Sequence, residues 1–592
     1  MITNELEFPF DGESIIKRKR KLKKELLEHV TGNPKKIAIL GGSTTNLVKD
    51  ILELFLLNLG IPVEFYESEY NRFYEDVMFD NPELMEFSPD IIYIHTTFRN
   101  LKNLPVVSDT KEIVKQKIEK EYGYFESLWE KAKKTYDCTI IQNNFEFPYV
   151  RNLGSIDGTD YRGYTAYVMA MNAKLAEYAS GHAGFYINDI QYQSSCYGLN
   201  QWADPFYWQL YKYVIAVPAI PYMTHELASL IGTLYGKTKK VACLDLDNTL
   251  WGGVIGDDGV DHIEIGQETA LAETYSEFQG YLKGLKERGI LLSVNSKNEE
   301  DVAVQGLKRP DSLLKEEDFS AKRINWNPKS ENLKEIAAEL NLLPESFVFI
   351  DDNPAEREIV RQQVEGCAVP ELTSAEYYAY ILDRNGYFDI SSLSVDDMKR
   401  AEMYQANASR LQLEKSFADY GEYLDSLEMQ AEIQAFQPCY LSRIAQLTNK
   451  SNQFNLTTKR CTETEIQMMA ESTDYVTLYG KLEDRFGDNG VVSVVIGQKK
   501  DATLDLELWL MSCRVLKRNM EYAMLDGLVD RARNDGIETL IGHYYPTAKN
   551  KMVSSFYDTM GFELISEDSD GNKTYQMNVK GYQKKNKHIH VE

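Results

Sequence analysis

The chain lacks the features that would place it in a membrane or outside the cell. No apolar run in its 592 residues approaches the length that a helix needs to cross a bilayer. Its first residues, Met-Ile-Thr-Asn-Glu-Leu-Glu, lack the basic and then apolar pattern of a secretory signal. The seven cysteines are odd in number and scattered, and no two form a Cys-x-x-Cys pair. We therefore expect a cytoplasmic protein without membrane insertion, a disulfide framework or a zinc site.

Positive charge is also scarce. Lys and Arg number 65 against 91 Asp and Glu, which gives a net charge of −26. Such a chain repels nucleic acid at long range, so we expect no nucleic-acid partner. The exception is the basic run at residues 17–24, which lies among apolar residues such as Ile15 and Leu22 and is typical of a helix with one solvated face. An anionic ligand must therefore be held by local groups.

What the chain does have is an α/β pattern in several parts. Hydrophobic residues make up 43% of it, which is ample for packing, and 592 residues are too many for one core. The strand candidates of the first part are residues 37–40, 91–95, 139–142 and 184–187. We predict three α/β domains, at residues 1–236, 237–385 and 429–592. A charged helical connector at 386–428 joins the second domain to the third.

In the second domain, three apolar segments end in polar groups. They span residues 241–247, 290–296 and 347–352. In an open parallel sheet the reacting groups lie where strands end, so Asp245 and Asp247 are expected at one sheet edge with room between them for a divalent cation. One carboxylate can attack phosphorus while the other manages protons. This arrangement predicts phosphoryl transfer.

Further polar groups follow in the same order along the chain. Ser296 ends the second segment, and its hydroxyl and the following amides can bind phosphate oxygens at a helix start. Lys329 lies in the first turn of a predicted helix, where a lysine opposes the macrodipole unless an anion lies in front of it. Asp351 and Asp352 end the third segment and offer the oxygen ligands that magnesium prefers. Each residue alone could serve as a turn former, a cap or a solvated side chain, but together they favour a functional site.

These motifs resemble the four motifs of the haloacid dehalogenase (HAD) superfamily. The chain is most similar to the FkbH-like branch, through Leu-Asp-Asn-Thr-Leu-Trp-Gly-Gly at 246–253 and Asp-Asp-Asn-Pro-Ala-Glu-Arg at 351–357. The resemblance implies that Asp245 is a nucleophile that becomes an aspartyl phosphate. It also implies that Asp247 protonates the leaving group and then activates water.

The same resemblance implies the remaining roles in this site. The residues that hold the transferring phosphoryl group are Ser296 and Lys329. The residues that bind magnesium are Asp245, Asp247 through its backbone carbonyl, Asp351 and Asp352. The stretches from Asp245 to Ser296 and from Ser296 to Lys329 are too short for an inserted cap, so we expect a Rossmann-like, capless HAD domain. An open site of this kind suits a bulky or carrier-bound substrate.

FkbH-like proteins remove phosphate from a phosphorylated three-carbon acid and pass a glyceryl group to an acyl carrier protein through a cysteine thioester. Some transferase members of that family carry the cysteine directly before a Ser-Lys-Asn string. Here the same string, at 296–298, follows Asn295, which cannot form a thioester. The resemblance therefore implies a magnesium-dependent phosphatase of a phosphorylated small metabolite more strongly than it implies glyceryl transfer. It places the activity in polyketide, capsule or surface-glycan synthesis, with an acyl carrier protein as an expected partner.

The last domain resembles GNAT-type acetyltransferases. A predicted strand at 504–510 turns into a predicted helix at 520–534, and such a turn exposes backbone amides to a pyrophosphate. The side chains that the resemblance places at coenzyme A or acetyl-CoA are Arg514, Lys517, Arg518, Asn550 and Tyr557. Lys517 and Asn519 stand where the family has glycines that let the backbone approach the cofactor. The alternative function is therefore an acyltransferase or carrier-binding module in which the HAD site is structural.

The first domain resembles SGNH-type hydrolases in one block. Residues 37–40 are followed by Gly-Gly-Ser-Thr-Thr, and that family places a nucleophilic serine after a strand in this way. The family also needs a late Asp-x-x-His pair, whereas the segment that begins at Asp204 has Tyr207 in the histidine position. Without a base the serine is not activated. We therefore expect a non-catalytic, SGNH-like α/β domain with a ligand site at Ser43, Asn143 and Asp204.

Overall fold

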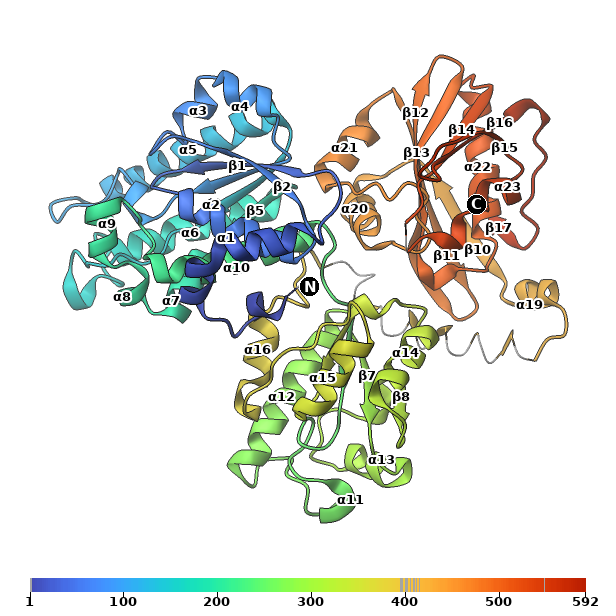
Figure 1. Cartoon of the computed structure of the whole chain (residues 1–592). Coiled ribbons are helices and arrows are strands. Elements are labelled where there is room, and N and C mark those ends of the chain that lie inside the picture. The colour runs from blue at the N-terminus through green and yellow to red at the C-terminus, as the bar shows by residue number, and fades with distance from the viewer. Residues whose placement is uncertain are drawn as a thin grey trace. The chain divides into compact units, whose positions relative to one another are not determined.

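Three β-sheets organise the chain (Figure 1). The computed structural model describes residues 3–393, 398–399, 403–404, 406–407, 410, 413–414, 416–547 and 549–592. Contacts group the chain into two compact units, Met1–Gly232 and Thr233–Glu592. The α/β fold class is as predicted, but the four domain ranges stay predictions. Much of the predicted connector at 386–428 lies outside the described residues.

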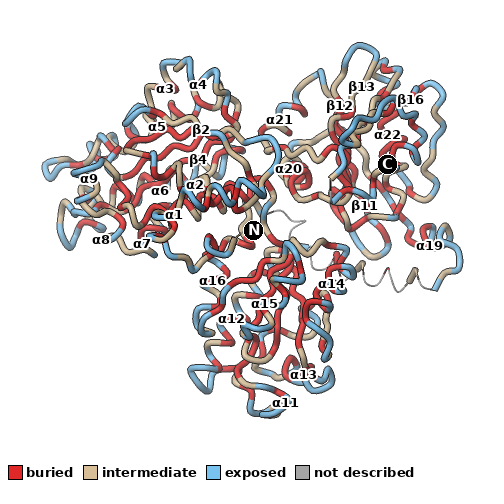
Figure 2. Tube along the Cα trace, in the orientation of Figure 1, coloured by how far each residue is buried: buried red, intermediate tan, exposed pale blue. Residues whose placement is uncertain are grey.

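The first unit is built on a parallel sheet of five strands. They are β1 (Lys35–Gly41), β2 (Val63–Glu67), β3 (Ile91–His95), β4 (Thr139–Asn143) and β5 (Phe185–Asn188). Their order is β2-β1-β3-β4-β5, so the chain reverses its direction of travel across the sheet between β1 and β3. Figure 2 shows the inner strands buried along most of their length. Ligands of open α/β sheets bind outside the carboxyl ends of the strands at such a switch point.

Helices connect these strands. Their bounds are α1 (Gly12–Leu27), α2 (Asn46–Asn58), α3 (Glu75–Met78), α4 (Pro82–Phe87), α5 (Lys111–Tyr136), α6 (Tyr164–Gly181), α7 (Ile190–Tyr197), α8 (Leu199–Trp202), α9 (Pro205–Tyr211) and α10 (Ile220–Leu234). Alternate strand residues point to one face of a sheet. Accordingly, Ala38 and Leu40 of β1 pack in one buried cluster with Trp129 of α5 and Met171 of α6.

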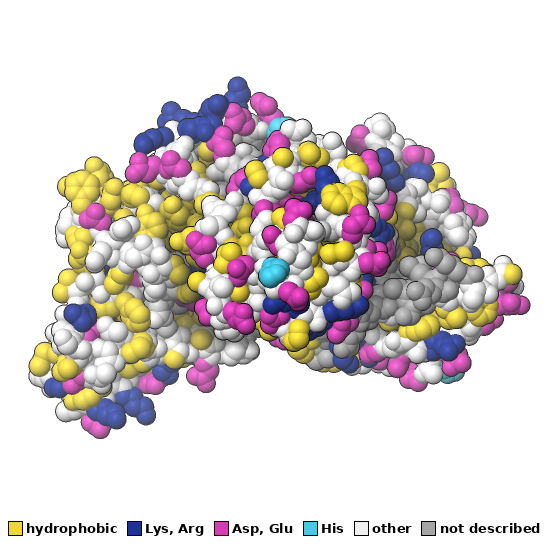
Figure 3. Space-filling view, turned by 90° about the horizontal axis from the view of Figure 1, so that it is seen from below, with side chains coloured by type: hydrophobic (Ala, Val, Ile, Leu, Met, Phe, Trp, Pro, Cys, Tyr) yellow, Lys and Arg dark blue, Asp and Glu magenta, His cyan; other side chains and the backbone are white. Residues whose placement is uncertain are grey.

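Helix α1 contains the basic run predicted from the sequence. Five of its cations pair with carboxylates: Lys17 with Glu13, Arg18 with Glu5, Lys19 with Asp50, Lys21 with Glu25, and Lys23 with Glu53. These pairs neutralise most of the local positive charge. Figure 3 shows acidic side chains scattered over the face that it presents, with Lys and Arg gathered in a few groups.

A second sheet of four parallel strands has the order β8-β7-β6-β9. Its strands are β6 (Val241–Leu244), β7 (Leu291–Ser296), β8 (Phe319–Ile324) and β9 (Phe347–Ile350). Its helices are α11 (Ile255–Asp258), α12 (Ala270–Glu287), α13 (Glu300–Lys308), α14 (Lys329–Glu339), α15 (Pro354–Gln363) and α16 (Tyr378–Arg384). Between β6 and β7, where every residue is described, the chain forms only α11, α12 and their loops. The sheet therefore has no inserted cap there, as predicted.

The third sheet is mixed, with the order β15-β16-β14-β13-β12-β11-β10-β17. The strands are β10 (Met429–Gln434), β11 (Tyr475–Asp484), β12 (Gly487–Lys500), β13 (Thr503–Met511), β14 (Thr539–Tyr544), β15 (Glu563–Glu567), β16 (Lys573–Asn578) and β17 (Ile589–Val591). The helices are α19 (Tyr420–Ser426), α20 (Leu441–Lys450), α21 (Glu463–Glu471), α22 (Met520–Asn534) and α23 (Phe556–Met560). None of the described helices of the chain combines the length and apolar composition needed to span a bilayer.

Candidate active site

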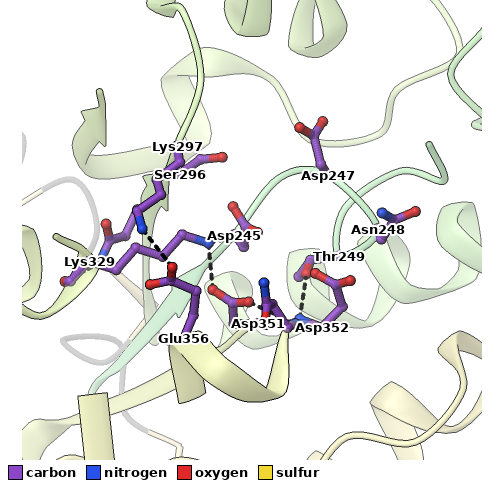
Figure 4. Close-up of polar contacts among 12 residues, drawn as sticks. Asp245, Asp247, Asn248, Thr249, Ser296, Lys297, Lys329, Asp351, Asp352 and Glu356 are labelled. Carbon is purple, nitrogen blue, oxygen red and sulfur yellow. Dashed lines mark hydrogen bonds and ion pairs between the residues drawn. The ribbon is translucent and has the colours of Figure 1, made fainter. Parts of the chain in front are cut away.

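The second sheet gathers the predicted polar groups at one edge (Figure 4). Asp245 follows β6, Ser296 ends β7, and Asp351 follows β9. Strand β6 pairs with both β7 and β9, and all three run in parallel, so their carboxyl ends lie together. Lys329 is the first residue of α14, whose buried face includes Leu333. The fold thus brings four motifs that are far apart in the sequence together in one site.

Lys329 bridges two carboxylates in the interior. Its Nζ lies 2.8 Å from Asp245 Oδ2 and 2.6 Å from Asp351 Oδ2. The three side chains are at most 9% exposed. Burial by itself lowers the pKa of Lys329, but the charges of Asp245 and Asp351 outweigh burial, so its pKa is raised above the usual value. The ammonium group therefore stays charged across the physiological range and neutralises part of a buried anionic cluster.

The pKa values of the two aspartates after β9 are raised above the usual value of an aspartate. Burial, followed by the nearby Asp245, raises the pKa of Asp351 to about 6, although Lys329 opposes the shift. Burial and Asp245 also raise the pKa of Asp352. At both carboxyls, burial together with the neighbouring Asp245 outweighs the opposing effect of Lys329.

The cluster fits a divalent cation. One carboxylate oxygen from each of Asp245, Asp351 and Asp352 lies within 4.8 Å of the other two. Oδ1 of Asp245 is buried and has no hydrogen-bond partner, so the site contains an acceptor that the protein itself leaves unsatisfied. Arg357 fixes the acidic loop by donating from Nη1 to the backbone carbonyls of Asp351 and Asp352, each at 2.8 Å. Clustered carboxylate oxygens are the donor set that magnesium prefers.

Asp247 is held apart from this cluster by its own set of donors. Its Oδ1 accepts hydrogen bonds from Trp251 Nε1 at 2.9 Å and from the Ile255 backbone N–H at 3.1 Å. Its Oδ2 accepts from Asn298 Nδ2 at 2.9 Å. Figure 4 shows the Asp247 carboxylate turned away from Asp245. The loop after β6 and the loop after β7 thus fix the orientation of Asp247 jointly.

The end of β7 contributes Ser296 and two asparagines. Ser296 is buried, and its Oγ accepts a hydrogen bond from Asn298 Nδ2 at 3.3 Å. Asn295 is also buried and donates from Nδ2 to the Lys329 carbonyl at 2.8 Å. Asn295 therefore joins the end of β7 to the start of α14 and positions the backbone of Lys329. Asn298, Trp251 and Arg357 were missed as functional residues, although all three belong to the strings that carry the FkbH-like resemblance.

Of the three residues expected at a ligand site in the first unit, two are engaged within the protein. Oδ1 of Asn143 accepts from Tyr93 Oη at 2.9 Å and from Asn188 Nδ2 at 2.8 Å. Asp204 caps α9 by accepting from the Phe206 N–H at 2.9 Å. Ser43 differs, because its buried Oγ has no hydrogen-bond partner. The ligand site expected from the sequence thus retains one residue with an unused polar atom.

The residues expected at coenzyme A are mostly buried and bonded within the third sheet's domain. Arg518 Nη1 lies 2.9 Å from Asp484 Oδ2, and Asn550 Nδ2 donates to two backbone carbonyls. Arg514 is buried against Ser512. The hydroxyl of Tyr557 is buried without a partner, whereas Lys517 is exposed. Lys517 is therefore the member of this set whose charge faces solvent.

In the turn between β13 and α22, two residues have the left-handed backbone conformation that glycine adopts most easily. Lys517 and Asn519 have φ angles of 65° and 64°. Such angles are uncommon for residues with a side chain. The turn thus has the left-handed positions at which the GNAT pattern has glycines, but with bulkier side chains.

Comparisons with known proteins agree with two parts of this description. Residues 36–232 match the family model described as FkbH, N-terminal domain. No curated protein matches the chain. Among solved structures, the chain is similar to the N-terminal part of the protein BF1531 from Bacteroides fragilis, which contains a phosphatase domain complexed with Mg. The identity is 29%, with 63% of this chain and 99% of that chain covered and a TM-score of 0.58.

Two acetyltransferases are also similar, at a lower level. The ribosomal-protein-S18-alanine N-acetyltransferase from Escherichia coli is 14% identical, with 25% of this chain and 94% of that chain covered and a TM-score of 0.21. An acetyltransferase of the GNAT family from Streptococcus pneumoniae is 15% identical, with 25% and 99% covered and a TM-score of 0.21. Likeness at this level carries no argument about activity. Residues 36–232 thus match an FkbH N-terminal domain, and 63% of the chain is similar to a structure with a magnesium-bound phosphatase domain.

Proposed function

We propose that the chain is a magnesium-dependent phosphatase of the HAD type that acts on a phosphorylated small metabolite through an aspartyl phosphate. The observation that carries this proposal is the buried cluster of Asp245, Lys329, Asp351 and Asp352, in which Asp245 Oδ1 has no partner. The similarity to a solved structure with a phosphatase domain complexed with Mg supports it. The FkbH-like strings around the cluster supply the residue roles.

In the first half-reaction, the Asp245 carboxylate attacks phosphorus, and the bond from phosphorus to the leaving oxygen breaks. The leaving oxygen takes its proton from Asp247. Lys329 and the Ser296 hydroxyl hold the equatorial oxygens of the phosphoryl group, on which negative charge is spread in the transition state. Bound magnesium would neutralise the remaining charge on those oxygens. The product on the protein is an aspartyl phosphate at Asp245.

In the second half-reaction, Asp247 accepts a proton from water while the water oxygen attacks phosphorus. The bond between phosphorus and the Asp245 oxygen breaks, which releases phosphate and restores the carboxylate. Trp251 and Asn298 orient Asp247 through hydrogen bonds at 2.9 Å.

The biosynthetic role belongs to the same proposal. We place the phosphatase in polyketide, capsule or surface-glycan synthesis, where it passes a glyceryl or acyl unit to an acyl carrier protein. The absence of an inserted cap between β6 and β7 supports a carrier-bound substrate. Asn295 cannot form a thioester, and its side chain donates to the backbone carbonyl of Lys329. A transfer step therefore needs a nucleophile other than the residue before Ser296.

The second candidate function is acyl transfer by the domain of the third sheet, with coenzyme A or acetyl-CoA as the cofactor. The left-handed backbone at Lys517 and Asn519 favours it, because that turn can present amides to a pyrophosphate. A thermal shift with acetyl-CoA tests it, since a ligand that binds only the folded state raises the melting temperature. No shift at saturating acetyl-CoA would contradict coenzyme A binding.

Phosphate release from a panel of phosphorylated three-carbon acids, sugars and acyl phosphates tests the phosphatase. We expect magnesium-dependent release from one class of compound and loss of that release in Asp245→Asn, which keeps the shape of the side chain but not its nucleophile. The matched control is Asp257→Asn, the same change at an exposed aspartate of α11. Equal release by wild type and Asp245→Asn would refute the aspartyl phosphate. Release from none of the compounds, with and without an acyl carrier protein, would favour a structural role for the site.

A further inference from the structure

Two loops meet at the point where the sheet of the first unit reverses its order. Residues 42–45 follow β1, and residues 96–100 follow β3. Asn100 joins these loops, because its Nδ2 donates to the Gly42 carbonyl at 2.9 Å and its Oδ1 accepts from the Thr97 N–H at 3.0 Å. Diverging loops at such a switch point are where doubly wound sheets bind ligands.

Each loop contains a buried hydroxyl that the protein leaves unused. Ser43 is 3% exposed and Thr97 is 0% exposed, and neither Oγ atom has a hydrogen-bond partner. A buried donor without a partner costs about 1–3 kcal/mol, so two of them on facing loops indicate a group that they are placed to meet. Each is the second residue after its strand, Ser43 after β1 and Thr97 after β3.

The start of α2 faces the same place. Helix α2 begins directly after the β1 loop and has thirteen residues. Its N-cap residue Thr45 makes no side-chain capping bond and donates its hydroxyl to Glu67 Oε1 at 2.8 Å. The first-turn N–H groups and the positive end of the helix dipole therefore point toward the loop without a capping side chain.

Two cations belong to segments that adjoin these loops. The Arg99 guanidinium lies 4.5 Å from the centre of the Trp208 ring, and Lys212 Nζ lies 5.1 Å from it. The end of α9 is attached to the β1 loop, since Thr44 donates from its N–H to the Lys212 carbonyl at 3.1 Å and from Oγ1 to the Tyr211 carbonyl at 2.9 Å. Arg99 thus belongs to the loop that contains Thr97, and the backbone of Lys212 is bonded to the loop that contains Ser43.

We propose that the first unit binds an oxyanion, the phosphate or carboxylate group of a small metabolite, between the hydroxyls of Ser43 and Thr97 and the cations of Arg99 and Lys212. This site is separate from the candidate active site and does not depend on the proposed phosphatase. Tyr207 stands where the SGNH pattern has its histidine base, and the His95 ring at the end of β3 is bonded to Tyr93 and Asn143, so the site recognises a ligand and does not hydrolyse it. Asn143 is bonded to Tyr93 and Asn188, and Asp204 caps α9. In this site, Thr97, Arg99 and Lys212 therefore accompany Ser43 in place of Asn143 and Asp204.

The nearby carboxylates are accounted for. Glu67 accepts hydrogen bonds from Thr45 Oγ1 and Lys49 Nζ. Glu146 accepts from the Phe98 N–H at 3.1 Å, and burial raises its pKa to about 7, with Arg99 opposing the shift. Glu67 is thus paired with Lys49, and burial favours the neutral form of Glu146 near Arg99.

The test is equilibrium dialysis of the full chain with radiolabelled inorganic phosphate, and separately with radiolabelled acetate, in the presence of EDTA. The two anions distinguish a phosphate site from a carboxylate site. We expect saturable binding of one of them, weakened roughly tenfold in Arg99→Gln because a charge-assisted contact is lost. Ser43→Ala should weaken binding as well, and Arg99→Lys should restore part of it. Thermal melting of each variant checks that it folds.

Two matched variants make the result decisive. Lys102→Gln removes another exposed cation of the same unit, one that lies 4.5 Å from the Tyr124 ring, and should leave binding unchanged. Asp245→Asn should also leave it unchanged, because that residue belongs to the candidate active site. Binding that is lost in Asp245→Asn, or that persists at full strength in Arg99→Gln, would overturn the proposal. Saturable binding of neither anion to the wild type would overturn it too.

Discussion

Replacing Lys329 by methionine should unbalance the candidate active site more than any other single change there. Lys329 Nζ contacts Asp245 at 2.8 Å and Asp351 at 2.6 Å, and all three side chains are almost fully buried. Methionine fills similar space but provides no charge. Two carboxylates would then remain in the interior without the cation that compensates them, at distances where like charges repel.

The expected loss follows from these contacts. Removing one partner of a buried ion pair costs about 3–5 kcal/mol, chiefly because a charge is left uncompensated. Here one lysine serves two carboxylates, so we expect a loss near the upper end, about 5 kcal/mol. Magnesium should recover part of it, because the carboxylate oxygens remain in place and no ammonium group competes with the cation. The variant should therefore gain more stability from magnesium than the wild type does.

Native-state hydrogen exchange of the peptides that cover β6 and β7 measures this effect where it occurs, since a chain of several domains has no single unfolding free energy. The matched control is Lys297→Met at the same sheet edge. Lys297 Nζ lies 2.6 Å from Glu356 Oε1, but its side chain is 36% exposed. A pair in which the lysine is partly exposed to solvent contributes less than a fully buried one, about 1 kcal/mol. Equal losses in the two variants, or no added response to magnesium in Lys329→Met, would refute the reasoning.

Three further changes test other contacts. Asn298→Ala removes the 2.9 Å hydrogen bond to Asp247 and should lower kcat roughly tenfold in steady-state phosphate release, whereas a change in KM alone would contradict an orienting role. Glu146→Gln should stabilise the first unit at pH 8 by about 3 kcal/mol and leave it unchanged at pH 4, because the pKa of Glu146 is raised to about 7 in the folded state and wild-type stability is therefore lost as pH rises through that value. Urea unfolding at the two pH values measures it, and a pH-independent difference would count against it. Asp484→Asn removes the buried partner of two arginines, one of them Arg518, and should cost about 3–5 kcal/mol in urea unfolding, with Asp488→Asn as the control.

The strands that are continuous apolar runs were predictable from the sequence, and two polar edge strands were not. β3, β6 and β9 are such apolar runs, and their positions match the predicted ones closely. β2 and β8 were missed because each lies at an edge of its sheet and is only partly buried. β8 includes Lys322 and Arg323, which hide the strand in a polar pattern. Apolar continuity indicates burial on both faces of a strand, and β2 and β8 do not have it.

The candidate site was predictable where it depends on strand ends. Topology alone brings Asp245, Ser296 and Asp351 to one edge, and Lys329 follows from the helix that starts there. The contacts of Asp247 with Trp251 and Asn298 were not predictable, because they depend on how two irregular loops fold against each other.

Motif positions predict residue types but not which atoms the protein itself uses. Arg518 and Asn550 stand where the GNAT pattern places cofactor contacts, yet their polar groups bond to Asp484 and to backbone carbonyls. In the first unit, Asn143 is likewise engaged by Tyr93 and Asn188. Such competition is decided by tertiary neighbours that are distant in sequence.

The two hydrogen bonds from Arg357 to successive backbone carbonyls have a consequence for entropy. A flexible acidic loop loses conformational freedom when it closes on an ion, and that loss weakens binding. Here a buried guanidinium fixes the backbone under Asp351 and Asp352 independently of their carboxylates. Their repulsion cannot relax by opening the loop. The conformational entropy of the loop is therefore lost when the protein folds. A cation that binds later does not have to order the loop, so its binding is not weakened by that loss.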